Sequence, residues 1–173
     1  MTQSKHRTKS LSKFIIIIVI IYIATFASLQ SLRFVLSTDY PIVVVEGVSM
    51  EKTYIQGDLL ILKGIPTQDI KIGDVVVYQR SILIVHRVVN IKVVNGETYF
   101  TTQGDNNPGP DPYDVPSTAV VGTVIYHAPA LGNVVLALQS PVGLVLSGGL
   151  IIIILLLDVF NEEEKKKKSS DAL

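Results

Sequence analysis

The sequence predicts a mainly β fold, a compact antiparallel domain flanked by an N-terminal and a C-terminal transmembrane helix. In the middle of the 173-residue chain, short runs rich in Val, Ile and Tyr follow one another closely, separated by Gly, Asp, Asn or Pro. No amphipathic helical pattern interrupts these runs. At each end lies a long apolar run without charged residues. The length suits one domain with accessory segments.

The first apolar run occupies residues 14–32, and its first ten residues are almost wholly Ile and Val. About 20 apolar residues cross the hydrocarbon core of a bilayer, so we expect a transmembrane helix here, after a basic cytoplasmic tail at 1–13. A cleaved signal peptide is the alternative interpretation. Its apolar region would be shorter, and the residues that follow make a poor small-x-small cleavage site, which favours an uncleaved anchor.

The second apolar run predicts another transmembrane helix over residues 132–158. No charged residue occurs from Ala128 to Leu157, and an unbroken Ile/Leu block leads to Asp158. A buried terminal helix is the alternative. The charged tail at 159–173 is expected to be a solvated cytoplasmic extension.

The distribution of Lys and Arg predicts the orientation in the membrane. Four basic residues precede the first span and four follow the second, but none lies between Lys92 and the second span. Basic residues accumulate on the cytoplasmic side, so both termini are expected inside and residues 33–131 form the domain on the extracytoplasmic face. We therefore expect a multi-pass cell-membrane protein in contact with membrane lipid.

Composition removes several function classes. The 15 basic and 15 acidic side chains balance to a formal net charge of zero, so no global field favours nucleic acid. The absence of Cys excludes disulfides, thiolate zinc sites and a cysteine nucleophile.

Six runs in the middle domain are expected to contain strands. The dipeptide Asn95-Gly96 predicts a two-residue hairpin between two of them, and the similar segments "GDLLIL" and "GDVVVY" predict a turn that feeds a strand. The runs are residues 40–47, 57–64, 73–80, 81–94, 97–104 and 119–129.

Few side chains in this domain are suited to chemistry. Ser49 follows an apolar run as a small hydroxyl beside Met50. The domain contains two histidines, and the alternation of strand residues puts His86 on the same face as Ile84 and Val88. A histidine on an apolar face is more often a hydrogen-bonded core residue than a catalyst. His127, just ahead of the second apolar run, has no evident partner.

The loop at 101–114 concentrates Asp105, Asp111 and Asp114 among Gly, Pro and Asn. Asp and Asn favour such loops simply by bonding their own backbone, and several oxygens close together also suit a calcium site. The spacing does not match an EF-hand and no Glu closes the loop. A hydroxyl, an imidazole and a carboxylate together could perform acyl transfer, but their order in the chain does not establish that geometry.

Five segments in order resemble the type I signal peptidases: "VEGVSM", "GDLLIL", "GDVVVY", "IVHRVV" and "TQGDNN". The similarity covers about residues 43 to 113 and is to the archaeal and endoplasmic-reticulum branch, in which a His replaces the general-base Lys of the bacterial enzymes. The resemblance implies a β domain of signal-peptidase type. It also implies a serine endopeptidase, without cofactor or metal, that removes signal peptides from exported preproteins after small-x-small sites.

The resemblance also implies roles for individual residues. The Ser before Met becomes the nucleophile Ser49, and the His before Arg-Val-Val becomes the general base His86. We favour Asp111 as the residue that orients His86 and Asp105 as one that shapes the site, although these two roles could be exchanged. The family commonly has a Ser two places before the nucleophile, where this chain has Gly47. The oxyanion would then be bound by backbone N–H groups, including that of Ser49.

Signal peptides are the expected partners, and the protein-export translocon is a candidate partner. The strand before Ser49 could pair with an extended substrate, and apolar side chains around it would form shallow pockets for small residues. The residues expected to contact substrate are Ile42, Val43, Val44, Val45, Met50 and Ile84.

Three alternatives stay open. A lysine base would have to be desolvated, and Lys63 and Lys71 have solvent-facing sequence contexts, with Lys92 the third lysine available. The change at Gly47 leaves room for a catalytically inactive, membrane-tethered β binding module. The aspartate-rich loop leaves room for a calcium-dependent surface module.

Overall fold

The computed structural model describes residues 2–170, and side chains for residues 15–154, 156 and 157. It divides the chain into two units. One unit contains Met1–Ala27 and Ala137–Leu173, and the other is Ser28–Leu136. The units are described separately below.

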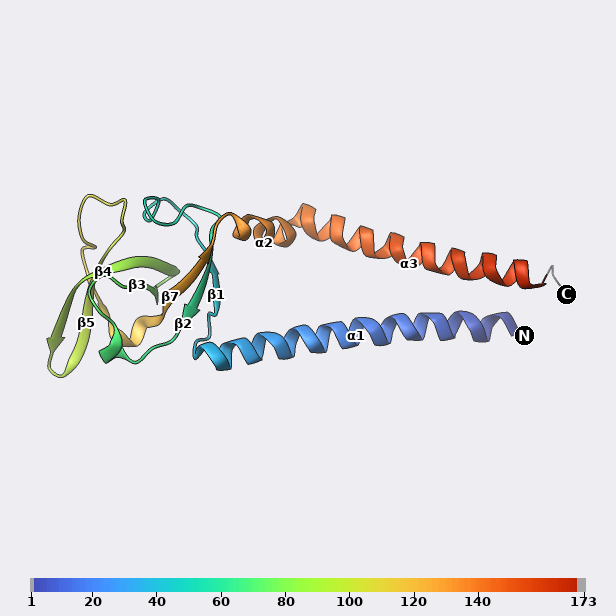
Figure 1. The fold of residues 1–173 in the computed structure, drawn as a ribbon, viewed down its shortest axis with the longest axis horizontal. Coiled ribbons are helices and arrows are strands. Elements are labelled where there is room, and N and C mark those ends of the chain that lie inside the picture. The colour runs from blue at the N-terminus through green and yellow to red at the C-terminus, as the bar shows by residue number, and fades with distance from the viewer. Residues whose placement is uncertain (1, 171–173) are drawn as a thin grey trace. The chain divides into compact units, whose positions relative to one another are not determined.

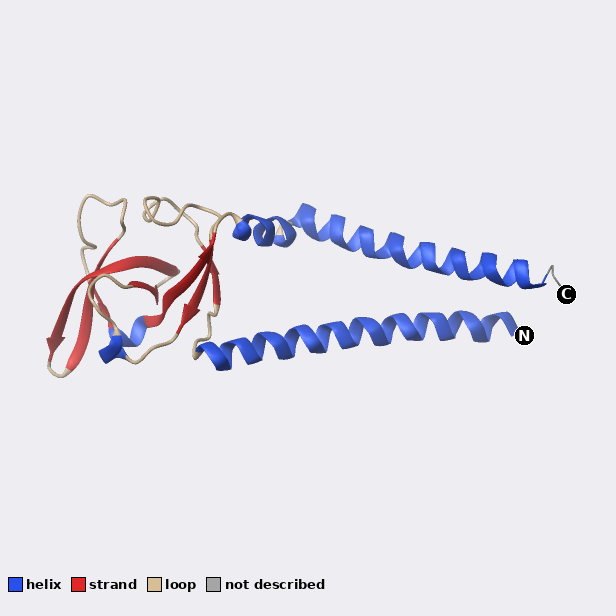
Figure 2. Ribbon diagram, in the orientation of Figure 1, coloured by secondary structure: helices blue, strands red, loops and turns tan. Residues whose placement is uncertain are grey.

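The unit Ser28–Leu136 is built on one seven-stranded antiparallel sheet with the order β1-β2-β7-β3-β4-β5-β6 (Figures 1 and 2). This confirms the mainly β class. Two 3₁₀ turns, Thr67–Asp69 and Ser117–Ala119, join strands. The strands are β1 Ile42–Val44, β2 Leu59–Lys63, β3 Val75–Gln79, β4 Leu83–Val94, β5 Glu97–Gln103, β6 Asp114–Pro116 and β7 Val120–Ala128.

Each of the six runs expected from the sequence contains a strand. The sequence pattern missed β6, whose three residues end in a proline and are too few for an alternation to register. The predicted hairpin joins β4 to β5. Asn95 and Gly96 have φ of +53° and +84°, the positive values that both central residues of such a turn adopt.

The two similar segments form the same kind of turn ahead of β2 and β3. The Asp58 carboxylate accepts the N–H of Ile55 at 3.0 Å, and the Asp74 carboxylate accepts the N–H of Lys71 at 2.8 Å. The glycine before each aspartate has a positive φ, +90° and +101° respectively. The expectation of a turn feeding a strand is thus confirmed in both places.

Strand β3 lies between the two hydrophobic clusters of the domain. Its alternate residues point to opposite faces, so Val76 and Tyr78 enter one cluster while Val77 enters the other. Burial on both faces explains why this strand is a continuous apolar run instead of an alternating one. The buried members of the first cluster are Ile70, Val76, Tyr78, Val88, Phe100 and Val115, and those of the second are Val45, Leu60, Leu62 and Val77.

Helix α1 spans Thr2–Leu36. Its segment Ile15–Leu36 has a mean hydropathy of 2.4 and no buried side chains, so it is long and apolar enough to cross a membrane.

The second apolar run differs from the single helix expected over 132–158. It forms α2 Leu131–Gln139 and α3 Pro141–Ser170, which meet at an angle of 78°. The reason is local, because Pro141 disfavours helical backbone at Ser140 and cannot donate a helical hydrogen bond. Ser140 Oγ instead accepts the N–H of Gly143 at 3.0 Å and caps α3. By length and composition, the described residues provide one candidate span, or two if this bent pair is counted as one.

Candidate active site

Ser49 lies in a tight turn that follows β1. Gly47 begins the turn with a φ of +101°, and the N–H of Glu51 donates to the Val48 carbonyl at 3.2 Å. The N–H groups of Thr53 and Tyr54 both donate to the carbonyl of Met50. Ser49 itself is half-buried.

His86 reaches the serine from the middle of the sheet. It lies on β4 opposite Val76 of β3 and is only 6% exposed. The Ser49 hydroxyl donates to His86 Nε2 at 3.1 Å, and His86 Nδ1–H donates to Asp111 Oδ2 at 2.6 Å. The structure therefore brings together three residues that are far apart in the sequence, in the order hydroxyl, imidazole, carboxylate.

Asp111 is anchored by two buried side chains that the sequence analysis did not single out. The Thr102 hydroxyl donates to Asp111 Oδ2 at 2.6 Å, and the Tyr78 hydroxyl donates to the same oxygen at 3.2 Å. The Asp111 N–H donates to the Thr102 carbonyl at 2.7 Å. Burial raises the pKa of Tyr78, so its hydroxyl keeps the proton that it donates. In the sequence these two residues are ordinary members of β-strands, and only the packing of β3 against β4 and β4 against β5 brings them to the carboxylate.

Asp105 occupies a different place from Asp111. Its carboxylate accepts two bonds from Arg87, Nε to Oδ1 at 2.8 Å and Nη2 to Oδ2 at 2.6 Å, and a third from the Thr53 hydroxyl. The Arg87 guanidinium is the main reason that the pKa of Asp105 is lowered. The structure thus puts Asp111 on His86, while Asp105 connects β4 to the segment that follows Ser49.

The segment Gly104–Asn106 packs directly on the Ser49 turn. The Asn106 N–H donates to the Ser49 carbonyl at 2.8 Å, and Asn106 Nδ2 donates to the Val48 carbonyl at 3.1 Å. A Cβ on Gly104 would lie 2.7 Å from the Ser49 carbonyl oxygen and 2.9 Å from its Cβ. Only glycine allows this approach without a backbone shift.

The residues expected to contact substrate differ in exposure. Ile42 is 43% exposed, and Val43, Val44 and Ile84 are half-buried. Val45 and Met50, in contrast, are 4% and 2% exposed. Val45 packs in the second hydrophobic cluster, and Met50 Sδ accepts the Asp105 N–H at 3.4 Å. These two side chains support the turn from inside and offer no surface to a substrate, which differs from the expectation.

The remaining candidates lie apart from this triad. Asp114 accepts from Lys92 at 2.9 Å and from the Thr101 hydroxyl at 2.7 Å, so the three aspartates of the loop bond to separate partners instead of converging on one cation. His127 has an aromatic neighbour that the sequence did not indicate, since its ring centroid lies 5.2 Å from that of Tyr54. Lys63, Lys71 and Lys92 are all exposed.

No family model matches the chain, but several characterised proteins do. It is 36% identical to the signal peptidase complex catalytic subunit SEC11 of Clavispora lusitaniae over 129 residues, which cover 68% of this chain and 77% of the relative. The chain belongs to the SEC11 signal peptidase family.

Other SEC11 signal peptidases give the same picture. The protein of that name from Schizosaccharomyces pombe is 32% identical over 151 residues, covering 70% of this chain and 80% of the relative. Human SEC11C is 43% identical over a shorter stretch of 74 residues, 40% of this chain and 38% of its own length. The expected branch combined archaeal and endoplasmic-reticulum enzymes, and these relatives are eukaryotic, so they belong to the endoplasmic-reticulum group. The family resemblance carried by the five segments is confirmed.

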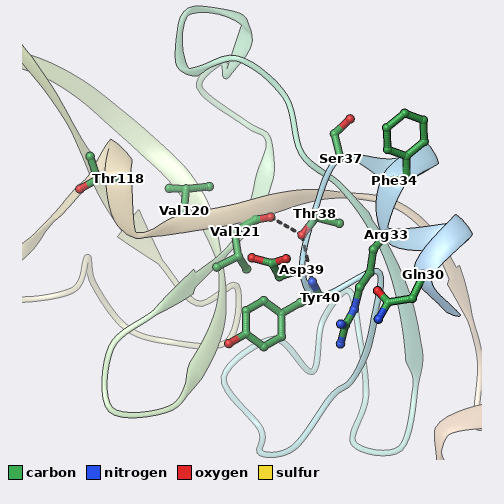
Figure 3. Close-up of a pocket in the computed structure, with 10 residues that line it drawn as sticks. All are labelled: Gln30, Arg33, Phe34, Ser37, Thr38, Asp39, Tyr40, Thr118, Val120 and Val121. Carbon is green, nitrogen blue, oxygen red and sulfur yellow. Dashed lines mark hydrogen bonds between the residues drawn. The ribbon is translucent and has the colours of Figure 1, made fainter. Parts of the chain in front are cut away.

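A pocket of about 610 Å³ lies elsewhere in the domain (Figure 3). The hydroxyl of Thr38, one of the lining residues, donates to the Val121 carbonyl at 2.6 Å and accepts the Tyr40 N–H at 3.2 Å. None of the residues that line it belongs to the Ser49–His86–Asp111 triad. The lining residues are Gln30, Arg33, Phe34, Ser37, Thr38, Asp39, Tyr40, Thr118, Val120 and Val121.

Proposed function

We propose that this chain is a membrane-anchored serine endopeptidase that removes signal peptides from exported preproteins. The observation that carries the proposal is the continuous hydrogen-bond chain from the Ser49 hydroxyl through His86 to Asp111, with distances of 3.1 Å and 2.6 Å. Membership of the SEC11 signal peptidase family supports the same substrate class.

In the proposed mechanism, Ser49 Oγ attacks the carbonyl carbon of the scissile peptide while His86 Nε2 takes the hydroxyl proton. His86 then gives this proton to the leaving amine as the C–N bond breaks and the acyl-enzyme remains. Water hydrolyses the ester through the same base. Asp111 holds the Nδ1–H tautomer, which leaves the lone pair of Nε2 directed at Ser49.

The tetrahedral intermediate needs donors for its oxyanion, and this chain has Gly47 where the family commonly has a serine hydroxyl. We assign the role to backbone N–H groups, with that of Ser49 as the first donor. Within the part of the chain that the structure describes, no acceptor is bonded to the Ser49 N–H. It is therefore available to a substrate oxygen.

The substrate segment is proposed to pair with β1, which is one of the two edge strands of the sheet. The Pro41 carbonyl accepts the N–H of Leu62 in β2, and the Val45 N–H donates to the carbonyl of Asp58, the residue just before β2. Because hydrogen-bonding direction alternates along an antiparallel strand, the backbone groups of Ile42 and Val44 face away from β2. An extended peptide could bond to them by strand addition and so bring its scissile bond to Ser49.

We further propose that the side chains of Ile42, Val43, Val44 and Ile84 line shallow pockets that admit only small residues at the first and third positions before the cut.

In the proposed topology the segments at 14–32 and 132–158 are embedded in the membrane, the second as the bent pair α2 and α3. Both termini are cytoplasmic, and the domain is extracytoplasmic. Lipid and the translocon would then be the neighbours of the enzyme.

The test is cleavage of a preprotein carrying a signal peptide by the full chain purified in detergent. Wild type should cut after a small-x-small site, while Ser49→Ala and His86→Ala, which keep the fold, should not. Cleavage that survives in His86→Ala alone would indicate a lysine base. If correctly folded wild type neither cleaves nor reacts with an acylating probe at Ser49, the proposal is wrong and the inactive binding module takes its place.

A further inference from the structure

We infer that Asn106 is a positioning residue that aims the backbone N–H of Ser49 at the oxyanion. The inference rests on the proposed function, because it assigns a role within the same acyl-transfer step. It concerns a residue that contacts no reacting atom and acts through the peptide group next to the nucleophile.

The geometry depends on one planar peptide group. The carbonyl of Val48 and the N–H of Ser49 belong to the same trans peptide, so they point in opposite directions. Asn106 Nδ2 donates to that carbonyl at 3.1 Å. A bond that fixes where the carbonyl points also fixes where the N–H points.

The next peptide group is held by the same residue. The Asn106 N–H donates to the Ser49 carbonyl at 2.8 Å, and that carbonyl shares its peptide with the N–H of Met50. Asn106 therefore restrains the peptide groups on both sides of the Ser49 Cα. In the described residues neither the Ser49 N–H nor the Met50 N–H has an acceptor. Asn106 therefore fixes the direction of both N–H groups and leaves them able to donate to a substrate oxygen.

Few other contacts restrain the start of the turn that carries Ser49. It begins at Gly47, and a Cβ at that position would meet no atom within 4 Å, so the side-chain direction of Gly47 faces open space. Val48 is 56% exposed, and the one other donor to its carbonyl among the described residues is the Glu51 N–H, at a longer 3.2 Å. A donor supplied by the backbone needs a fixed peptide plane in order to be preorganised.

Asn106 can supply the restraint because its own segment is held firmly. The neighbouring Asp105 bonds twice to Arg87, and its N–H donates to Met50 Sδ. Gly104 is buried against Ser49. The side chain of Asn106 thus extends from a fixed point onto the exposed part of the turn.

The experiment compares Asn106→Ala, Asn106→Asp and the matched control Asn107→Ala in the full detergent-purified chain. The first two remove the amide donor to Val48 while leaving the backbone N–H of residue 106 in place. Asn107 is the adjacent asparagine. Among the described residues it forms hydrogen bonds only through its backbone, from its N–H to the Gly104 carbonyl and from Gln103 Nε2 to its own carbonyl. Thermal unfolding of each variant reports whether the fold is kept.

Two readouts separate positioning from simple structural support. The first is kcat and KM for a signal-peptide substrate. The second is affinity for a peptide aldehyde compared with a peptide amide of the same sequence. Ser49 Oγ adds to the aldehyde carbon, the electron pair of the C=O bond moves to oxygen and the serine proton passes to His86, so only the aldehyde develops an oxyanion.

We expect Asn106→Ala and Asn106→Asp to lower kcat by about tenfold with KM nearly unchanged, less than the ~10²–10³-fold loss seen when an oxyanion donor itself is removed. Aldehyde affinity should fall by a similar factor while amide affinity and the Asn107→Ala variant stay at wild-type values. Unchanged kcat in Asn106→Ala, or equal losses for aldehyde and amide, would overturn this inference alone. A wild-type chain that neither cleaves nor binds the aldehyde would overturn the proposed function as well.

Discussion

His86 Nδ1 lies 2.6 Å from Asp111 Oδ2, and the same carboxylate oxygen also accepts the hydroxyls of Thr102 and Tyr78. Three donors converge on one oxygen, from strands β4, β5 and β3. The sheet therefore fixes the position of the carboxylate. An imidazole bonded to so fixed an acceptor keeps one tautomer and one orientation.

Replacement of Asp111 by Asn should lower kcat by about 10³–10⁴-fold while leaving the fold intact. The amide keeps the shape of the carboxylate but can stabilise the other tautomer of His86, with the proton on the nitrogen that faces Ser49. Preprotein cleavage at saturating substrate measures the effect. Asp114→Asn is the control, because Asp114 pairs with Lys92 at the surface. Equal activity in the two variants would contradict the assignment of Asp111.

Replacement of Gly104 by Ala should lower kcat by about 10²-fold, because the added Cβ would lie 2.7 Å from the Ser49 carbonyl oxygen and displace the nucleophile. Cleavage assays and thermal unfolding measure both parts of the effect. Gly109→Ala is a matched control in the same loop, where a Cβ would meet nothing within 4 Å. It should retain wild-type activity, and a parallel loss there would show that the loop tolerates no side chain for other reasons.

Replacement of Val44 by Pro should raise KM by about fivefold, since it removes one backbone donor from the free edge of β1 and a hydrogen bond contributes ~1 kcal/mol. The N–H of Val44 faces away from β2, so the pairing of β1 with β2 does not depend on it. Steady-state cleavage of a signal-peptide substrate gives KM, and circular dichroism reports the fold. An unchanged KM would argue against strand addition at this edge.

The Asp105–Arg87 pair should make the domain sensitive to acid. The pKa of Asp105 is lowered in the folded state, chiefly by its hydrogen bonds to Arg87, so the folded state binds its proton less readily than the unfolded chain. Its stabilising effect is therefore present above the unfolded pKa of about 4 and is lost as the pH falls through the lower folded value.

Urea unfolding at several pH values tests this, with Asp105→Asn as the variant. The free energy of unfolding of wild type should exceed that of the variant near neutral pH, and the difference should shrink below about pH 4. Asp114→Asn, which removes a more exposed ion pair with Lys92, should show a smaller and more salt-sensitive difference. A difference for Asp105→Asn that does not vary with pH would contradict the linkage.

The sequence predicted the strands well because their signals are local. Alternating or continuous runs of β-branched residues and the Asn95-Gly96 turn depend only on neighbours in the chain. The short strand β6 and the bend at Ser140–Pro141 were missed for opposite reasons. Strand β6 has too few residues for an alternating pattern. Pro141 does indicate a helix break, but the prediction for that run rested on its hydropathy alone.

The candidate site was predictable in its residue types and in its family, and less so in its contacts. Ser49, His86 and the two aspartates could be named from local segments, but the choice between Asp105 and Asp111 could not be made from their spacing. Thr102, Tyr78 and Asn106 lie within the segments that resemble the family, but nothing in those segments assigned a role to any of the three side chains.

The sequence by itself determined the β class, the apolar segments and which residues are chemically able to act, because these follow from local pattern and side-chain type. Only the tertiary structure decided that Asp111 bonds to His86, that Met50 and Val45 are buried, and that Asn106 forms hydrogen bonds to the Ser49 turn. These are hydrogen bonds and contacts of a few ångströms between segments 25 to 58 residues apart in the chain. Such contacts depend on strand register and loop packing, which no local run of residues encodes.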